Sequence, residues 1–283
     1  MHADGETMNR TSLHPAIRPL LSSDIPAAMT LIREVGWNQL PADWERLLAL
    51  EPQGCFALEC SGCLAATTTA VCYDTELAWI GMVLTLPEFR RRGFAELLMH
   101  RALEFVEQRG IPTVKLDATE IGINLYRRLG FAEECAVERW RRPPGPLAAL
   151  ALPPYHPDTD YDREKFGANR TALLAQLAPL GSASLPGQGY AMGRPGSLAA
   201  YFGPCVANSP DAARTLLHWF LAQHPQEDVF WDLLPGNQEA VRLAKEFGFV
   251  PVRHLVRMVR SNGAAPPLSN HTELFAIAGF EFG

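Results

Sequence analysis

The feature that most constrains this chain is a short pattern that occurs once in each half. Leu125–Phe131 (LYRRLGF) in the first half matches Leu243–Phe249 (LAKEFGF) in the second. Each pattern closes a helix-like stretch that follows the Asp-containing end of a predicted strand, at Asp117 and at Asp232. A repeat of such long period indicates duplication, so we expect two similar domains. With 283 residues, of which 47% are hydrophobic, each half is long enough to form its own core.

A proline-rich stretch separates the two halves. Residues 141–146 read RRPPGP, and prolines follow at Pro153, Pro154 and Pro157. So many prolines favour a stiff, extended connector at a domain boundary. We therefore expect a flexible tail over 1–15, a first domain over 16–142, a linker over 143–157 and a second domain over 158–283.

The hydrophobic patterns predict a similar run of elements in both halves. In the first half we expect strands at 17–19, 55–60, 63–72, 77–86, 114–116 and 131–140, and helices at 25–35, 43–50, 95–108 and 121–129. In the second half we expect helices at 163–177, 212–222 and 238–247, and strands at 189–194, 199–207, 229–233, 249–259 and 273–282. This order predicts an α/β architecture with layers of helices on sheets.

Charge and hydropathy exclude several classes of protein. The formal net charge of -6 gives no global attraction to nucleic acid. The apolar runs are too short and too often interrupted to span a membrane, and the first ten residues lack the apolar run of a signal peptide. These features favour a cytoplasmic enzyme or binding protein.

The pair Cys60 and Cys63 allows two interpretations. A CxxC spacing occurs in zinc and redox sites, but no second Cys or His pair stands at ligand spacing elsewhere in the chain. Ser61 and Gly62 lie between two strand-like runs, as the turn of a two-residue hairpin would. We favour the hairpin, treat the thiols as free and expect no metal.

The segment most suggestive of chemistry is Arg90–Ala95 (RRRGFA). It follows an apolar strand and opens a strong helix, where unpaired backbone N–H groups and the helix dipole favour a phosphate. Gly93 and Ala95 allow a ligand to approach the backbone, and three arginines add phosphate-directed charge. The alternative is a merely solvated helix start, but arginines at a positive helix N-terminus are unfavourable without an anion. We therefore expect an anion site.

Arg90-x-x-Gly93-x-Ala95 resembles the Gln/Arg-x-x-Gly-x-Gly/Ala signature of the GCN5-related N-acetyltransferase (GNAT) family, and Leu125–Phe131 resembles that family's LYxxLGF ending. The resemblance covers roughly residues 15–142. It implies two tandem domains, each with a mixed, mostly antiparallel sheet flanked by helices. It also implies that acetyl-CoA is the cosubstrate and that the loop cradles its pyrophosphate through Arg90, Arg91, Arg92, Gly93, Phe94, Ala95 and Glu96.

The resemblance implies further roles. The backbone of Val83, Leu84 and Thr85 would pair with the pantetheine arm and hold the thioester carbonyl. Tyr126 stands where the family often has a tyrosine that protonates the departing thiolate; the alternative is a tyrosine that packs on the sheet. Thr119 replaces an asparagine that contacts the cofactor in many relatives.

The general base and the acceptor site are less well defined. Glu76, Asp117 and Glu120 border the expected cleft, but a water relay or ordinary surface carboxylates would explain them equally well. In the family the stretch between the first two helices, here residues 36–44, usually lines the acceptor pocket. Its two tryptophans, two amides and one carboxylate suit a cationic or polar amine, or they belong to the core.

The second half lacks the features of the anion site. Its corresponding loop, 209–214, has neither the glycine nor the arginine cluster, and Asp211 fits better as a helix cap than as part of a phosphate site. Ala244 stands where the first half has Tyr126, whereas Asn237 and Ala240 still match the family pattern. We expect a degenerate domain that has lost coenzyme A binding.

These observations predict an acetyl-CoA-dependent N-acetyltransferase that acts on a primary amine, most simply a small molecule, by direct attack. No cysteine lies at a helix N-terminus beside the loop, which argues against an acyl-cysteine route. The alternatives are a non-catalytic acyl-CoA sensor, with the second domain as its interaction surface, and an unrelated phosphate-binding protein. The identity of the acceptor, the acyl-chain preference and the oligomeric state stay open.

Overall fold

The computed structural model describes residues 15–155, 159–263 and 272–283, so the predicted tail lies outside the described residues except for Pro15. The elements of the first half are β1 (Ala16–Pro19), η1 (Ser22–Asp24), α1 (Ile25–Val35), α2 (Pro41–Leu50), β2 (Cys55–Cys60), β3 (Cys63–Tyr73), β4 (Leu77–Thr85), η2 (Pro87–Phe89), α3 (Phe94–Gln108), β5 (Thr113–Ala118), α4 (Glu120–Arg128) and β6 (Ala132–Arg142). Those of the second half are α5 (Thr159–Phe166), α6 (Thr171–Leu177), η3 (Ala178–Leu180), β7 (Ser182–Leu185), β8 (Gly189–Arg194), β9 (Ala200–Ala207), α7 (Pro210–Gln223), β10 (Val229–Leu233), α8 (Gln238–Glu246), β11 (Val250–Ser261) and β12 (Leu274–Ala276).

Two predicted elements of the second half need correction, and one strand was not predicted. The helix expected over 163–177 is two helices, because the chain turns at Gly167, whose φ is 93°. The strand expected over 273–282 is paired only at β12, and the amides of Phe282 and Gly283 then close a turn onto the carbonyl of Gly279. The short strand β7 was missed, since its sequence SASL has little hydrophobic signal.

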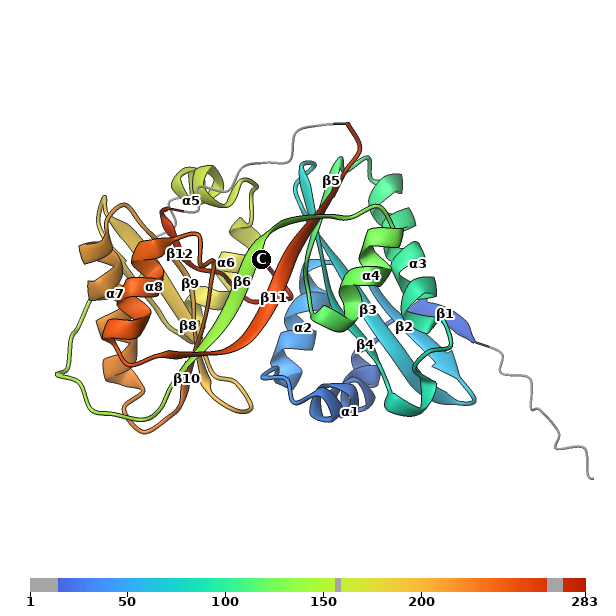
Figure 1. Ribbon diagram of the computed structural model, residues 1–283, viewed down its shortest axis with the longest axis horizontal. Helices are drawn as coiled ribbons and strands as arrows, with labels where there is room; N and C mark the ends of the chain where they lie inside the picture. Colours follow the sequence, from blue (N-terminus) through green and yellow to red (C-terminus); the bar gives the residue numbers. More distant parts are fainter. Residues whose placement is uncertain (1–14, 156–158, 264–271) are drawn as a thin grey trace, which may run out of the picture.

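The sheets of the two halves join through an exchange of strands. In the order β1-β2-β3-β4-β5-β11-β6-β10-β9-β8-β7, strand β11 lies next to β5 and β6 lies next to β10. Both contacts are antiparallel, as is the pairing of β6 with β11, and these two strands cross side by side between the halves (Figure 1). Each domain is thus completed by the last long strand of the other. The predicted mixed sheet of two tandem domains is confirmed, and the exchange is an addition to it.

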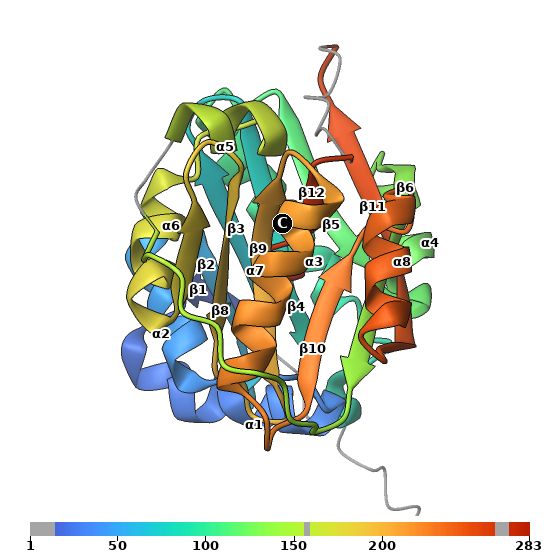
Figure 2. The same cartoon turned by 90° about the vertical axis from the view of Figure 1, so that its left-hand side faces the viewer.

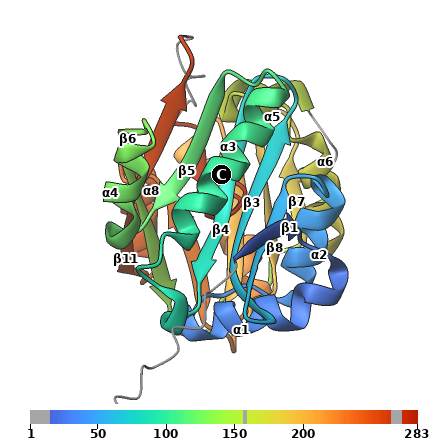
Figure 3. The same ribbon diagram turned by 90° about the vertical axis from the view of Figure 1, so that its right-hand side faces the viewer.

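Two pairs of helices cover the outer faces of the sheet. Helices α3 and α4 lie on the outer face of the first half (Figure 3), and α7 and α8 lie on the outer face of the second (Figure 2). Their amphipathic faces form two separate outer cores, with Leu98 and Val106 fully buried in the first and Leu216 and Leu243 in the second. Each domain therefore has a hydrophobic core of its own on this side.

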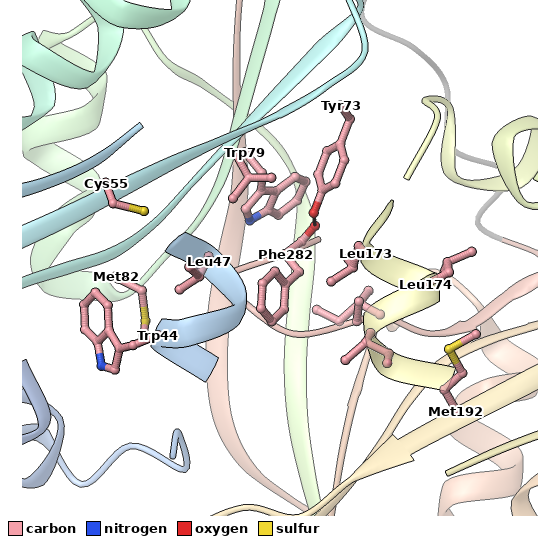
Figure 4. Close-up of a cluster of buried hydrophobic side chains, with 14 of the residues drawn as sticks. Trp44, Leu47, Cys55, Tyr73, Trp79, Met82, Leu173, Leu174, Met192 and Phe282 are labelled. Atoms are coloured by element: carbon pink, nitrogen blue, oxygen red, sulfur yellow. Dashed lines mark hydrogen bonds between the residues drawn. The ribbon is translucent and has the colours of Figure 1, made fainter. Parts of the chain in front are cut away.

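A third core lies between the two halves and belongs to both. It combines Trp44 and Leu47 of α2, Leu173 of α6 and Phe282 near the end of the described chain (Figure 4). The Tyr73 hydroxyl donates a 2.7 Å hydrogen bond to the carbonyl of Phe282. Because segments far apart in the sequence share this core, burial of its apolar surface holds the two domains together.

The Cys60–Cys63 segment is the predicted hairpin. Cys60 and Cys63 face each other at the ends of β2 and β3. Ser61 and Gly62 have φ of 55° and 75°, as a two-residue hairpin turn requires. Within the described ranges no group of His, Cys, Asp and Glu side chains is arranged to hold a metal ion.

Candidate functional site

A cleft opens between two parallel strands of the first domain. Strands β4 and β5 pair only from Leu77 and Thr113 to Trp79 and Lys115, and then separate. In the part of the chain that the structure describes, the remainder of β4 has no strand on this side. Backbone polar groups along such an edge need other partners, so the edge is suited to bind an extended ligand.

The free edge of β4 contains a β-bulge. The register with β3 shifts between Thr67, opposite Leu84, and Thr69, opposite Gly81, which leaves Met82 and Val83 in the bulge. Met82 has a φ of 51°, a strained value for a side chain of this kind. A bulge turns backbone groups out of the regular ladder, here where the strand borders the cleft.

Two threonines of β3 hold this bulge in place. The Thr67 hydroxyl donates to the carbonyl of Met82 at 2.8 Å, and the Thr68 hydroxyl donates to the carbonyl of Gly81 at 3.4 Å. Both threonines are fully buried. Their hydroxyls satisfy the carbonyls that the bulge displaces, so the strained backbone is a fixed part of the fold.

The loop after β4 ends in a helix start with free donors. Gly93 precedes α3 with a φ of 80°, and no side chain caps the helix. Among the described residues, no acceptor is recorded for the backbone N–H groups of residues 91–96. A Cβ on Gly93 would meet no atom within 4 Å, so the space above this turn is open. The geometry is that of an anion-binding helix N-terminus.

The three arginines of this loop are exposed and differ in their contacts. The Arg90 Nε donates to the carbonyl of Thr85 at 3.2 Å, and Arg92 lies over the ring of Phe89 at 5.5 Å. Arg91 has a φ of 59° and no recorded ion pair within the described residues. Glu96 lies 3.7 Å from Arg128, so its carboxylate is partly neutralised beside the donors.

Tyr126 of α4 reaches a small cavity beside the bulge. The side chain is 8% exposed and packs edge-on against Phe131, with ring centroids 6.1 Å apart. Burial raises the pKa of Tyr126, so the phenol stays protonated at neutral pH. A Cβ on Gly122 would lie 2.7 Å from the tyrosine ring, so glycine is needed there for the close packing.

Both domains line this cavity, whose volume is about 50 Å³. The first domain supplies predicted site residues, among them Val83, Thr119 and Tyr126. The second supplies residues of β11 and of the C-terminal turn. The complete lining is Trp37, Ile80, Gly81, Met82, Val83, Leu116, Asp117, Thr119, Tyr126, Arg253, Leu255, Phe280 and Glu281.

The segment expected to line the acceptor pocket contributes one residue to it. Trp37 lines the cavity, whereas Trp44 is fully buried in the core between the domains. Asn38 is also structural, because its side-chain oxygen accepts from the amides of Leu198 and Ala199 at 2.8 and 3.0 Å. The core interpretation is therefore correct for Trp44, and this segment mainly joins the two domains.

Of the three carboxylates considered as a base, only Asp117 lines the cavity. Glu76 pairs with Arg163 at 3.0 Å, and Glu120 is exposed on α4. Neither is among the cavity's lining residues. Burial raises the pKa of Asp117, and the bidentate bond from Arg257, at 2.9 and 3.0 Å, opposes that rise. Asp117 is thus committed to an ion pair.

Glu281 is a cavity carboxylate that the sequence did not reveal. It is 2% exposed and accepts hydrogen bonds from Gln39 at 3.0 Å and Arg194 at 2.9 Å. A Cβ on Gly81 would lie 2.8 Å from its Cα, so the C-terminal turn packs directly on β4. Burial raises the pKa of Glu281, while Arg194 opposes the rise. Its only sequence signal was an acid in an apolar terminal stretch.

The corresponding cleft of the second domain is filled by the chain itself. Strand β12 pairs with β9, and the amide of Ile277 donates to the carbonyl of Asp232 on β10 at 3.0 Å. The Trp231 indole N–H also donates to the carbonyl of Phe275 at 2.8 Å. In the second domain the C-terminal segment therefore occupies the strand edge, whereas the corresponding edge of β4 in the first domain is free.

Two further details separate the second domain from the first. The register of β9 with β8 also shifts, opposite Ala191 and Gly193, but the displaced stretch of β9 contains Pro204, which has no N–H. At the start of α7 the cap is Ser209, whose hydroxyl accepts from the amide of Ala212 at 3.3 Å. The prediction that Asp211 caps this helix is wrong, since Asp211 is exposed two residues after the cap, in the first turn of the helix.

A larger hollow, of about 500 Å³, lies in the second domain between α8 and the start of β11. Its indole and acidic groups bond to each other: Trp140 donates to Glu138 at 2.8 Å, and His254 lies 3.1 Å from the same carboxylate. The helix start at its edge, Gln238 of α8, is already capped, because the side chain of Asn237 accepts from the amide of Ala240 at 3.1 Å. The features that suit group transfer therefore gather at the smaller cavity.

Comparison with known proteins agrees with this geometry. Residues 23–131 match the acetyltransferase (GNAT) family, and residues 159–276 match an acetyltransferase (GNAT) domain. The chain belongs to the GNAT family. An uncharacterised N-acetyltransferase of Methanocaldococcus jannaschii is 36% identical over 70 residues, which are 24% of this chain and 31% of that relative's length.

Solved structures show the same tandem fold. A putative acetyltransferase from Pyrococcus horikoshii, 21% identical, matches all of both chains with a TM-score of 0.83. A tandem GNAT protein from the clavulanic acid biosynthesis pathway, 14% identical, matches 89% of this chain and all of its own with a TM-score of 0.62. Among the described residues no helix has the length and apolarity needed to cross a bilayer.

Proposed function

We propose that this GNAT protein transfers an acetyl group from acetyl-CoA to a primary amine in the cleft between β4 and β5. The observation that carries the proposal is the open, bulged edge of β4 leading into the uncapped N-terminus of α3. An extended backbone edge suits a pantetheine arm, and free amides with arginines suit a pyrophosphate.

The residues that would hold acetyl-CoA fall into two groups. The backbone of Val83, Leu84 and Thr85 would bind the pantetheine arm at the free strand edge. The loop and helix start would bind the pyrophosphate, and Thr119 lies across the cleft at the start of α4. The pyrophosphate group comprises Arg90, Arg91, Arg92, Gly93, Phe94, Ala95 and Glu96.

When bound, acetyl-CoA supplies an activated acetyl thioester, whose acyl C–S bond breaks as the C–N bond to the amine forms. The Val83 N–H in the bulge would donate to the acetyl carbonyl oxygen as negative charge develops there. Tyr126 would give its proton to the departing sulfur. Glu281 would accept a proton from the amine, since it lines the same cavity and burial raises its pKa. Unlike Asp117, it has only one oxygen bonded to an arginine, and the other accepts from the neutral amide of Gln39.

The second domain would not bind coenzyme A. Strand β12 takes the strand edge, Pro204 removes a donor and Asp211 puts an acid at the helix start. We propose instead that this domain completes the site of the first, through β11 and the C-terminal turn. Binding of two equivalents of acetyl-CoA per chain in a calorimetric titration would contradict this assignment.

The direct test is thiol release from acetyl-CoA with a panel of amines, with wild-type protein beside an Arg91→Ala/Gly93→Ala double variant. We expect turnover with at least one amine class and an increase of tenfold or more in the KM for acetyl-CoA in the variant, since charged phosphate contacts are lost. Arg214→Ala at the start of α7 is the matched control and should leave that KM unchanged.

Three outcomes would contradict the proposal in different ways. An unchanged KM for acetyl-CoA in the double variant would mean that the loop does not hold the cofactor. Binding of acetyl-CoA without transfer to any amine would support an acyl-CoA sensor instead. No affinity for coenzyme A at all would mean that this GNAT protein binds a different anion at the loop.

A further inference from the structure

The charges around the cavity are balanced with one exception. Asp117 pairs with Arg257 at 2.9 Å, and Asp232 pairs with Arg139 at 2.7 Å. Glu281 belongs to a network with Arg194, Asp43 and Arg46, which holds two acids and two bases. Every other charged side chain that lines the cavity is thus neutralised by a neighbour.

Arg253 is the exception. It lines the cavity from the exchanged strand β11, is half-buried, and lies over the ring of Trp37 at 5.5 Å. Within residues 15–155, 159–263 and 272–283, no carboxylate pairs with it and no carbonyl accepts from it. Burial lowers the pKa of Arg253 from its ordinary value, and the neighbouring charge of Arg139 adds to this effect.

A half-buried guanidinium without an anion is energetically unfavourable. Its five N–H donors lose water on burial, and it stays charged at any physiological pH. The acid whose charge acts on it, Asp232, is already held by two 2.7 Å bonds from Arg139. An anionic ligand group would supply both the missing charge and the missing acceptors.

We propose that the acceptor amine also carries a carboxylate, as an amino acid does, and that Arg253 binds that carboxylate. This inference rests on the proposed acetyl transfer. A phosphate dianion fits less well, because the single uncompensated guanidinium of this cavity balances only one negative charge. The carboxylate of an amino acid carries one negative charge, which matches the single uncompensated cation of this cavity.

The position of Arg253 on the sheet supports this role. Arg253 and Leu255 both line the cavity, as residues two apart on one face of a strand do. The register of β11 with β6 shifts between Pro251 and Arg253, so β11 is locally bulged next to the cavity. The acceptor site is therefore built on the strand that the second domain donates.

The test compares initial rates of thiol release for three matched acceptors: phenylalanine, phenylalanine amide and phenethylamine. For the wild-type protein we expect kcat/KM to be at least tenfold higher with the carboxylate than with either uncharged partner. Arg253→Gln should remove that preference by raising the KM for the amino acid, and Arg253→Lys should restore part of it. The KM for acetyl-CoA should not change in either variant.

Arg260→Gln, on the same strand but paired with Glu107, is the control and should behave as wild type. The inference is overturned if the wild-type protein acetylates the amide and the amine as well as the amino acid, or if Arg253→Gln slows all three equally. If the protein acetylates no amine in the panel, with amino acids included, the proposed function itself is overturned. Calorimetric titration of the CoA-bound protein with phenylalanine gives a readout independent of turnover, and weaker binding by Arg253→Gln is expected there.

Discussion

Arg257 and Asp117 form a buried, bidentate ion pair between strands from opposite halves of the chain. They face each other in the register of β11 and β5, and their side chains are 2% and 0% exposed. Arg139 and Asp232 repeat the arrangement between β6 and β10. Each exchanged strand thus brings an arginine to the aspartate of the domain that receives it.

Removing one partner of this pair should destabilise the whole protein. Arg257→Met leaves the Asp117 carboxylate buried without a counter-charge, so we expect a loss of about 3–5 kcal/mol in the free energy of unfolding. The double variant Arg257→Met/Asp117→Leu should recover much of that loss. Urea unfolding measures both, and Arg242→Gln, in an exposed pair with Glu239, should change stability by less than about 1 kcal/mol. A loss for Arg257→Met as small as that of the control would contradict the assignment.

Val83→Pro places a proline in the bulge of β4, where the corresponding stretch of β9 in the second domain has Pro204. It removes the N–H proposed to bind the acetyl oxygen, so kcat should fall by about 10²–10³-fold. Val83→Ala keeps the N–H and is the matched control, with a much smaller loss expected. Both variants are measured by thiol release, with thermal unfolding to confirm that the sheet is intact. Equal losses in the two variants would mean that the donor is not used.

Tyr126→Phe keeps the aromatic packing against Phe131 and removes only the hydroxyl. We expect unchanged binding of acetyl-CoA and a kcat lower by about 10²-fold, the scale of a lost general acid. Because burial raises the pKa of Tyr126, its ionisation should not limit the wild-type rate between pH 7 and about 9. The pH–rate profile and a calorimetric titration check both expectations. Full activity in Tyr126→Phe would assign this tyrosine to packing alone.

Asp24 should contribute a pH-dependent part of the stability. Two bonds from Arg18, at 2.7 and 2.9 Å, lower the pKa of Asp24 in the folded protein. Its contribution is therefore present above the unfolded pKa of about 3.9 and is lost as pH falls through the lower folded value. Asp24→Asn should cost no more than about 1 kcal/mol at pH 6, since Arg18 is partly exposed, and a smaller amount near pH 2.5. Urea unfolding at both pH values tests this, with Asp74→Asn on an exposed turn as the control. A cost that grows as the pH is lowered would contradict the sign.

Much of the first domain was predictable because local signals coincide there. The run from β4 through Gly93 to α3 combines an apolar strand, a glycine with positive φ and an amphipathic helix, and all three appear where the sequence places them. The Ser61–Gly62 turn is similar, since a two-residue hairpin has a narrow choice of residues. These elements are defined by neighbours in the sequence.

The strand exchange and the cavity depend on partners far along the chain. Strands β6 and β11 have similar lengths and patterns, and nothing in their sequences distinguishes pairing within a domain from pairing across it. Arg253 and Glu281 enter the site only through that exchange and the terminal turn. The proposed cofactor loop is therefore predictable from the sequence of the first domain, whereas the groups that would face the acceptor are not.

The exchange of β6 and β11 also affects how the protein can be made. On the ribosome, the first half emerges before β11 exists, because β11 begins only at Val250, and until then β5 has β4 as its neighbour on one side alone. Its exposed edge must be protected from other chains until more than a hundred further residues have been synthesised. The site can therefore form only after the second half has been synthesised. If the gene were split between the domains, each product would lack the strand that the other half supplies to its sheet.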